Sequence, residues 1–158
     1  MQEPPAPRFN VRVYGIMIQE GRILVSDEFI RGGFYTKFPG GGLEFGEGSL
    51  DCLKREWMEE IGQEIEILEH FYTTDIFQIS AFDNFSQIIS IYYLVRGITP
   101  FTAKTLDLPF DFRVPEGISE MEVMRWVPLD QFSPDQVTLN IDKVVAAMIK
   151  DRFDQKVP

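Results

Sequence analysis

Residues 41–63 read Gly41-Gly-Leu-Glu-Phe-Gly-Glu-Gly-Ser-Leu-Asp-Cys-Leu-Lys-Arg-Glu-Trp-Met-Glu-Glu-Ile-Gly-Gln63. A glycine-rich turn runs directly into a predicted short helix that carries Glu56, Glu59 and Glu60. Side chains three and four residues apart share one face of a helix, and like charges at this spacing destabilise it by a few tenths of a kcal/mol, of the order of 0.2–0.5. The sequence accepts that cost, which indicates that the three carboxylates together hold a divalent cation.

The expected helix has a start signal, a stop signal and one apolar face. Ser49 is a suitable N-cap, because its hydroxyl can accept a hydrogen bond from a free backbone N–H. Gly62 is a suitable stop, because glycine adopts the left-handed conformation that ends many helices. The apolar residues recur at helical spacing and should face a core; they are Leu50, Leu53, Trp57 and Ile61.

A solvated acidic face is the simplest alternative for such a helix, since glutamate is a good helix former. The preceding turn, Pro39 to Gly42, favours a ligand site, because glycine lets the backbone approach a ligand closely. Glu44 and Glu47 add two carboxylates from that turn, and Arg55 can pair with a neighbouring acid and hold the turn against the helix.

The spacing of the segment resembles the signature of the MutT-like Nudix hydrolases. That signature is Gly, five residues, Glu, seven residues, Arg-Glu, an apolar residue, any residue, Glu-Glu, any residue, Gly and a further apolar residue. Only the last position departs, with Gln63 where an aliphatic residue is usual, and that position concerns packing. A match at this many fixed spacings is specific; the matching residues are Gly41, Glu47, Arg55, Glu56, Trp57, Glu59, Glu60 and Gly62, with the lead-in Phe38-Pro39-Gly40 and Glu44.

This resemblance implies an α/β fold, namely an α/β/α sandwich with a mixed sheet, and hydrolysis of a phosphoanhydride bond in a nucleoside diphosphate linked to another group. It also implies Mg²⁺ as the cofactor, with Mn²⁺ as a substitute. Glu56 and Glu60, one turn apart on a single face, are the first expected ligands; Glu59 is the next, and the family pattern adds the carbonyl of Gly40. The same pattern gives supporting roles around the metal to Glu44, Glu47 and Arg55.

The general base and the substrate contacts are less constrained. Family members use either a glutamate of the motif or one in a distant loop, and here Glu120, with Glu122 next, lies before Trp126 where such a residue falls. Arg22 and Lys37 are candidates for phosphate contacts, and Phe77 for stacking on a base. The sequence has none of the additional motifs that distinguish the substrate subgroups of the family, so it does not identify the nucleotide.

Composition agrees with one compact domain. The chain has 158 residues, 44% of them hydrophobic, and a net charge of −10, so a nucleic acid duplex is an unsuitable partner. We expect a flexible leader over residues 1–8 and a single Nudix domain over residues 9–158. No stretch has the features of a signal peptide or the roughly 20 apolar residues of a membrane span, and the lone Cys52 fits a reducing, cytoplasmic location.

Hydrophobic patterning outside the motif predicts a strand-rich chain. The long apolar run within residues 86–96 is expected to lie centrally in a sheet. Residues 30–35 and 98–119 are interpreted as loops because of their glycines and prolines. The predicted elements are strands at 11–18 and 22–26, an extended segment at 64–68, a hairpin of 72–81 with 86–96, a strand at 123–127, a helical turn at 130–132 and an amphipathic helix at 137–153.

Two other functions stay open from the sequence. One is a catalytically idle module that binds a nucleotide without cutting it, although an idle site has no reason to retain mutually repelling acids. The other is an isoprenoid diphosphate isomerase of the same fold, which needs a cysteine and glutamate outside the motif, whereas Cys52 lies inside it. Related proteins commonly dimerise, so a homodimer is a further expectation.

Overall fold

The computed structural model describes residues 1–154. The last four residues of the expected domain, 155–158, lie outside the described part. The strands form a mixed sheet in the order β5-β6-β1-β2-β8-β7, with β4 paired to β1 and β3 paired to β2. The elements are β1 (Arg8–Gln19), β2 (Arg22–Ile30), β3 (Gly33–Lys37), β4 (Gly40–Gly42), α1 (Ser49–Ile61), β5 (Ile65–Thr73), β6 (Ser86–Gly97), β7 (Thr105–Leu106), β8 (Glu120–Pro128), the short turns η1 (Leu129–Gln131) and η2 (Pro134–Gln136), and α2 (Asn140–Asp154).

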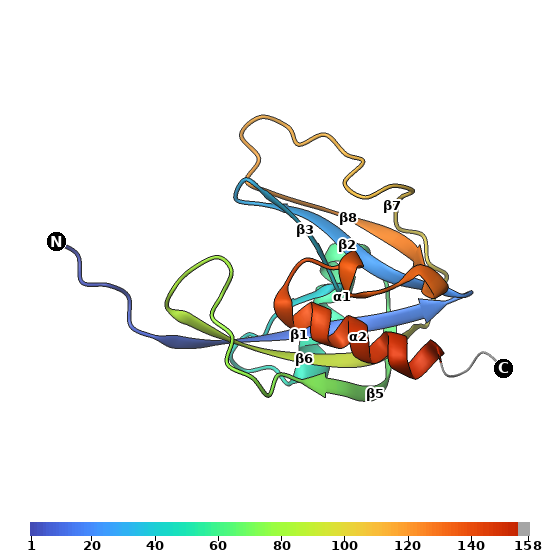
Figure 1. Ribbon diagram of the computed structural model, residues 1–158, viewed down its shortest axis with the longest axis horizontal. Coiled ribbons are helices and arrows are strands. Elements are labelled where there is room, and N and C mark those ends of the chain that lie inside the picture. The colour runs from blue at the N-terminus through green and yellow to red at the C-terminus, as the bar shows by residue number, and fades with distance from the viewer. Residues whose placement is uncertain (155–158) are drawn as a thin grey trace.

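Two helices cover opposite faces of the sheet, with α2 in front of the strands and α1 behind them in Figure 1. The core is divided accordingly. On the α1 side, Leu53 and Trp57 pack with Val13 of β1, and on the α2 side, Val145 and Ile149 form part of the other cluster. The α/β/α sandwich with a mixed sheet is therefore confirmed.

Helix α1 ends as the sequence predicts but begins differently. Gly62 caps the C-terminus with φ 69° and donates its N–H to the carbonyl of Met58. Gly48, not Ser49, is the N-cap, and the Ser49 hydroxyl instead lies 2.8 Å from the hydroxyl of Tyr93. The capping prediction was wrong because the serine had a partner on β6. Leu50 is also exposed, so the predicted apolar face is one residue too long.

Strands β1 and β2 pair with each other only next to their connecting turn, at Ile18 with Ile23 and Gln19 with Arg22. Beyond that point they diverge, as Figure 1 shows. Strand β4 then pairs along β1, and β3 along β2. The divergence separates one half of the sheet, with β5, β6, β1 and β4, from the other, with β3, β2, β8 and β7.

Two predictions need correction, the loop at 30–35 and the hairpin of 72–81 with 86–96. Residues 33–35 belong to β3, although the adjacent glycines indicated a loop. The hairpin partner of β6 is β5, which runs antiparallel to it with two register irregularities, and β1 pairs with β6 on the other side in parallel. The predicted arm at 72–81 is strand only to Thr73, and Ile79 makes an isolated bridge to Gln87. Strand β6 is thus internal in the sheet, as expected.

The C-terminal region follows the prediction more closely. A helical turn at η1 is present, and the closing helix begins at Asn140 rather than at 137, because Val137 follows the separate turn η2. Residues 98–119 are irregular apart from β7. No helix within residues 1–154 is long and apolar enough to cross a membrane.

Candidate active site

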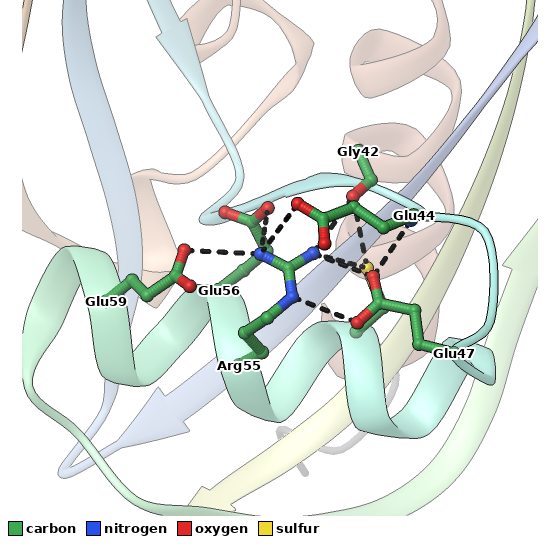
Figure 2. Close-up of polar contacts among 7 residues, drawn as sticks. Gly42, Glu44, Glu47, Arg55, Glu56 and Glu59 are labelled. Atoms are coloured by element: carbon green, nitrogen blue, oxygen red, sulfur yellow. Dashed lines mark hydrogen bonds and ion pairs between the residues drawn. The ribbon is translucent and has the colours of Figure 1, made fainter.

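Arg55 lies at the centre of the acidic cluster, as Figure 2 shows. Its Nε and Nη2 donate to the two carboxylate oxygens of Glu47 at 2.9 and 2.7 Å, and Nη2 also donates to the carbonyl of Gly42 at 3.2 Å. Its Nη1 donates to Glu56 at 3.0 Å and to Glu59 at 3.2 Å. One planar guanidinium with five donors therefore ties the glycine turn to the helix.

The bidentate contact changes the ionisation of Glu47. Hydrogen bonds from Arg55, followed by the backbone N–H of Glu44, lower the pKa of Glu47 to about 2. The pKa of the Cys52 thiol is raised to about 12. Burial is the larger cause, and the hydrogen bond with Glu47 is the next. Cys52 is thus an inert buried thiol, which argues against a nucleophilic role.

Two glycines bring the backbone against the acidic side chains. A Cβ on Gly41 would lie 2.4 Å from the carboxyl carbon of Glu56, so a larger residue there would displace the end of that side chain. Gly40 has φ 155°, and a Cβ there would lie 2.0 Å from the carbonyl oxygen of Val13. Gly40 therefore has to be glycine because the β1 backbone lies against it, whereas at Gly41 the glycine fixes where the carboxylate of Glu56 lies.

Trp57 fixes the same turn from the opposite face of the helix. Its ring packs where a side chain on Gly15 would stand, 2.8 Å away, and its Nε1 donates to the carbonyl of Pro39 at 3.2 Å. Trp57 is fully buried. Trp57, at the apolar position of the motif, therefore packs α1 against β1 and holds the segment that leads into β4.

A cavity of about 820 Å³ lies where the two halves of the sheet diverge. Its volume suits a ligand of nucleotide size, since small-molecule pockets span roughly 300–1,000 Å³. It reaches Glu60 of α1 and the carboxylates of Glu28 and Glu122 on neighbouring strands, and its far wall includes the first turn of α2. Gly40 also lines it, which places the predicted carbonyl ligand at the same cavity.

Two acids of this cavity, Glu60 and Glu122, resist ionisation. The pKa of Glu60 is raised to about 9. Burial is the largest cause, followed by the charge of Glu122 and by the hydrogen bond and charge of Glu56. Burial and the charge of Glu28 raise the pKa of Glu122 to about 7, although Lys37 opposes this. Glu60 as a residue is exposed, so water moderates the cost. The direction is the same for both: these carboxylates lack enough positive charge.

Cationic side chains from strands β1 and β3 line the same cavity. Arg12 donates from Nε to the hydroxyl of Tyr14 at 2.6 Å, and Lys37 donates to Glu28 at 3.2 Å. Arg8, Asn10, Arg12 and Tyr14 alternate along β1, and all line the cavity. Sequence reasoning missed Arg12, and that alternation of polar residues with Val11 and Val13 is the signal that could have revealed it.

Asp142 is a further buried acid on the α2 wall. Its Oδ1 accepts a hydrogen bond of 2.5 Å from the hydroxyl of Tyr92, whereas Oδ2 has no partner within residues 1–154. Burial raises the pKa of Asp142 to about 6, against the hydrogen bond from Tyr92 and the charge of Lys37. From the sequence, Asp142 lies on a predicted amphipathic helix, and an acidic residue there is expected to be exposed to solvent.

A model of the NUDIX domain matches residues 6–148, which is most of the chain. The chain belongs to the NUDIX family. No curated protein matches it. As a NUDIX hydrolase it shares the fold of several solved structures, each below 25% identity.

The solved structures include the ORF135 protein of E. coli, with a TM-score of 0.64 and 18% identity over 96% of both chains. A structure from a study of MutT from Aliivibrio salmonicida and Vibrio cholerae has a TM-score of 0.61 and 20% identity, covering 92% of this chain and 99% of that one. An ADP-ribose pyrophosphatase from Streptococcus suis has a TM-score of 0.52 and 14% identity over 94% of both chains.

The NUDIX structure separates the predicted site residues into those at the cavity and those away from it. Glu60, Gly40 and Lys37 line the cavity, and Glu56 adjoins it through Glu60. Glu120 also lines it but is exposed, whereas Glu122 is half-buried.

Three other predicted residues point elsewhere. Glu59 is turned towards Arg55. Arg22 lies at the far end of β2 with its guanidinium 5.1 Å from the Trp126 ring, and Phe77 is exposed and outside the cavity lining. Neither Arg22 nor Phe77 can therefore contact a ligand held in this cavity.

Proposed function

We propose that this NUDIX hydrolase cuts a phosphoanhydride bond in a nucleoside diphosphate linked to another group, with Mg²⁺ or Mn²⁺ as its cofactor. The observation that carries the proposal is that Glu60 and Glu122 line one cavity, with Glu56 in contact with Glu60, while basic side chains line the same cavity. The carboxylates at the α1 end of the cavity repel a polyphosphate, so this end can hold one only when a cation joins the acids to the substrate.

The donor set fits a hard divalent cation. Magnesium prefers oxygen ligands, and the available groups are the carboxylates of Glu56, Glu60 and Glu59 together with the carbonyl of Gly40. Within residues 1–154, no three His, Cys, Asp or Glu side chains already surround one point as a metal site requires. Glu56 and Glu59 contact Arg55 instead, and the exposed pair with Glu59 is worth at most about 1 kcal/mol, so Glu59 can exchange Arg55 for a metal.

When bound, the cation would neutralise the bridging phosphates and lower the pKa of a coordinated water. The protein groups have separate tasks. Arg55 holds Glu47 and Gly42, which fixes the glycine turn against α1. Glu122 is our choice of proton acceptor rather than the exposed Glu120, because it lies in the cavity within the electrostatic range of Glu56 and Glu60.

The proposal is tested by incubating the protein with dNTPs, NTPs, ADP-ribose, nucleotide sugars and dinucleoside polyphosphates, each with Mg²⁺, Mn²⁺ or EDTA. We expect release of phosphate, pyrophosphate or a nucleoside monophosphate from at least one of them, only with metal, and a loss of orders of magnitude in Glu60→Gln. Glu66→Gln, a surface acid paired with Arg96, is the matched control. Binding without turnover across the panel would favour the idle nucleotide-binding module instead.

A further inference from the structure

Arg12 is a cavity cation with uncommitted hydrogen-bond donors, and it lies beside the glycine turn. Among the described residues it forms no ion pair, and its one side-chain hydrogen bond uses Nε. Both terminal nitrogens of the guanidinium are therefore without a protein acceptor in that part of the chain. Of the other basic residues of the lining, Lys37 is paired with Glu28, and Arg8 and Arg31 each make one hydrogen bond, to Ser86 and to the carbonyl of Phe82. Arg12 differs from these two arginines because it lies against the same ring as Lys37 and pairs with the glycine turn.

Arg12 and Lys37 both lie against the ring of Tyr14. The guanidinium carbon of Arg12 is 5.7 Å from the centroid of Tyr14, and the ammonium of Lys37 is 5.8 Å from it. Lys37 is 5% exposed. Burial lowers its pKa, but the phenol of Tyr14 and the carboxylate of Glu28 outweigh this, and the pKa is raised overall. The charge of Arg12 acts on Lys37, and Glu28 is a carboxylate that acts on both cations.

Like charges so close repel each other, and the aromatic ring offsets only part of that cost. A phosphoryl group is the partner that matches the arrangement. It carries the opposite charge, and its oxygens accept two parallel hydrogen bonds from the planar fork of an arginine. The backbone keeps this fork beside the catalytic turn, because Arg12 pairs with Gly42 of β4.

We propose that Arg12, with Lys37, forms a phosphoryl subsite that binds part of the substrate's polyphosphate through protein groups alone, independently of any metal. The inference rests on the proposed function and names a feature of its substrates: they carry at least one phosphoryl group beyond those that the carboxylate-bound cation neutralises. Arg12 acts as a binding residue, so its loss raises KM much more than it lowers kcat.

Isothermal titration of the metal-free protein with pyrophosphate in EDTA tests the subsite. We expect the parent to bind pyrophosphate at millimolar concentration or below. Arg12→Gln should weaken binding by about tenfold or more, since a charge-assisted bidentate contact is lost. Arg12→Lys keeps the charge without the fork and should give an intermediate loss; it also replaces the glutamine variant if that fails to fold. Arg96→Gln removes one exposed positive charge elsewhere and should bind as the parent does.

The subsite is overturned if the parent does not bind pyrophosphate, or if Arg12→Gln binds it with the parent's affinity. Failure of the proposed function gives a different result. If Arg12→Gln loses pyrophosphate but no member of the nucleotide panel is hydrolysed, the subsite stands and the enzymatic assignment falls. If the panel is hydrolysed with an unchanged KM in Arg12→Gln, only the subsite falls.

Discussion

Replacing Asp27 by Asn should destabilise the protein more than any other change of a single charge outside the acidic cluster. Asp27 is fully buried, and four donors converge on its carboxylate. Arg125 contributes Nε at 2.7 Å and Nη2 at 3.0 Å, Thr36 its hydroxyl at 2.7 Å, and Phe110 its backbone N–H at 3.2 Å. The amide group of an asparagine would have to face one of these donors with a donor of its own.

The expected loss of unfolding free energy follows from the burial of the Asp27–Arg125 ion pair. Arg125 is 5% exposed, so the substitution leaves a guanidinium in the interior without a counter-charge. Breaking such a pair from one side costs about 3–5 kcal/mol. For a chain of this length each kcal/mol lowers Tm by about 2–4 °C, so we expect a fall of about 6–20 °C. Urea unfolding followed by circular dichroism, together with a thermal melt, measures both quantities.

Glu66→Gln provides the control, because it removes one carboxylate from an exposed pair with Arg96. Surface pairs contribute about 0–1 kcal/mol, so this variant should melt close to the parent. The buried pair also links β2 to β8, the strands that carry Glu28 and Glu122, so its loss should reach the cavity. A loss of less than about 1 kcal/mol in Asp27→Asn would refute the reasoning, since it would mean that Arg125 needs no buried partner.

Three further predictions concern α1 and its turn. Arg55→Gln should return the pKa of Glu47 from about 2 towards 4.5 in a carboxyl NMR titration. A depressed pKa stabilises the fold above pH 4.5, and this stabilisation is lost as the pH falls through 2, so the variant should lose less stability on acidification. An unchanged pKa of Glu47 would contradict the assignment. Gly41→Ala should displace Glu56 and lower metal-dependent turnover by roughly 10²-fold with little loss of Tm, and parent-like turnover would show that the close contact is unimportant. Cys52 should react with a thiol reagent only on unfolding, and rapid labelling of the native protein would disprove the burial and the raised pKa.

The fold was predictable where local chemistry and tertiary packing agree. Gly62 ends α1 because its left-handed conformation is a local property. Strand β3 escaped prediction because the glycines before it indicate a loop, and only pairing with β2 makes residues 33–37 a strand. The Ser49 cap failed for a similar reason: Tyr93, 44 positions away, takes its hydroxyl. Contacts distant in sequence decided both outcomes.

The site divides in the same way. Fixed spacing on one helix brought Glu56 and Glu60 together, and the sequence contains that information directly. Arg12 and Asp142 reach the cavity only because β1 and β2 diverge and α2 closes the other wall, which no local pattern encodes. Arg22 was a reasonable candidate by charge, but it lies at the end of β2 where the two strands still pair.

Divalent cation binding by α1 is the most direct test of the account. Titration calorimetry with Mn²⁺ and Mg²⁺ should show binding to the parent, and Glu56→Gln and Glu60→Gln should each weaken it by at least about tenfold while Tm is retained or raised, because each removes a repelling carboxylate. Two results would contradict the assignment of the acidic face of α1 as the metal site. One is a parent protein that binds neither cation, with or without nucleotide, and the other is that the glutamine variants bind the cations as tightly as the parent does.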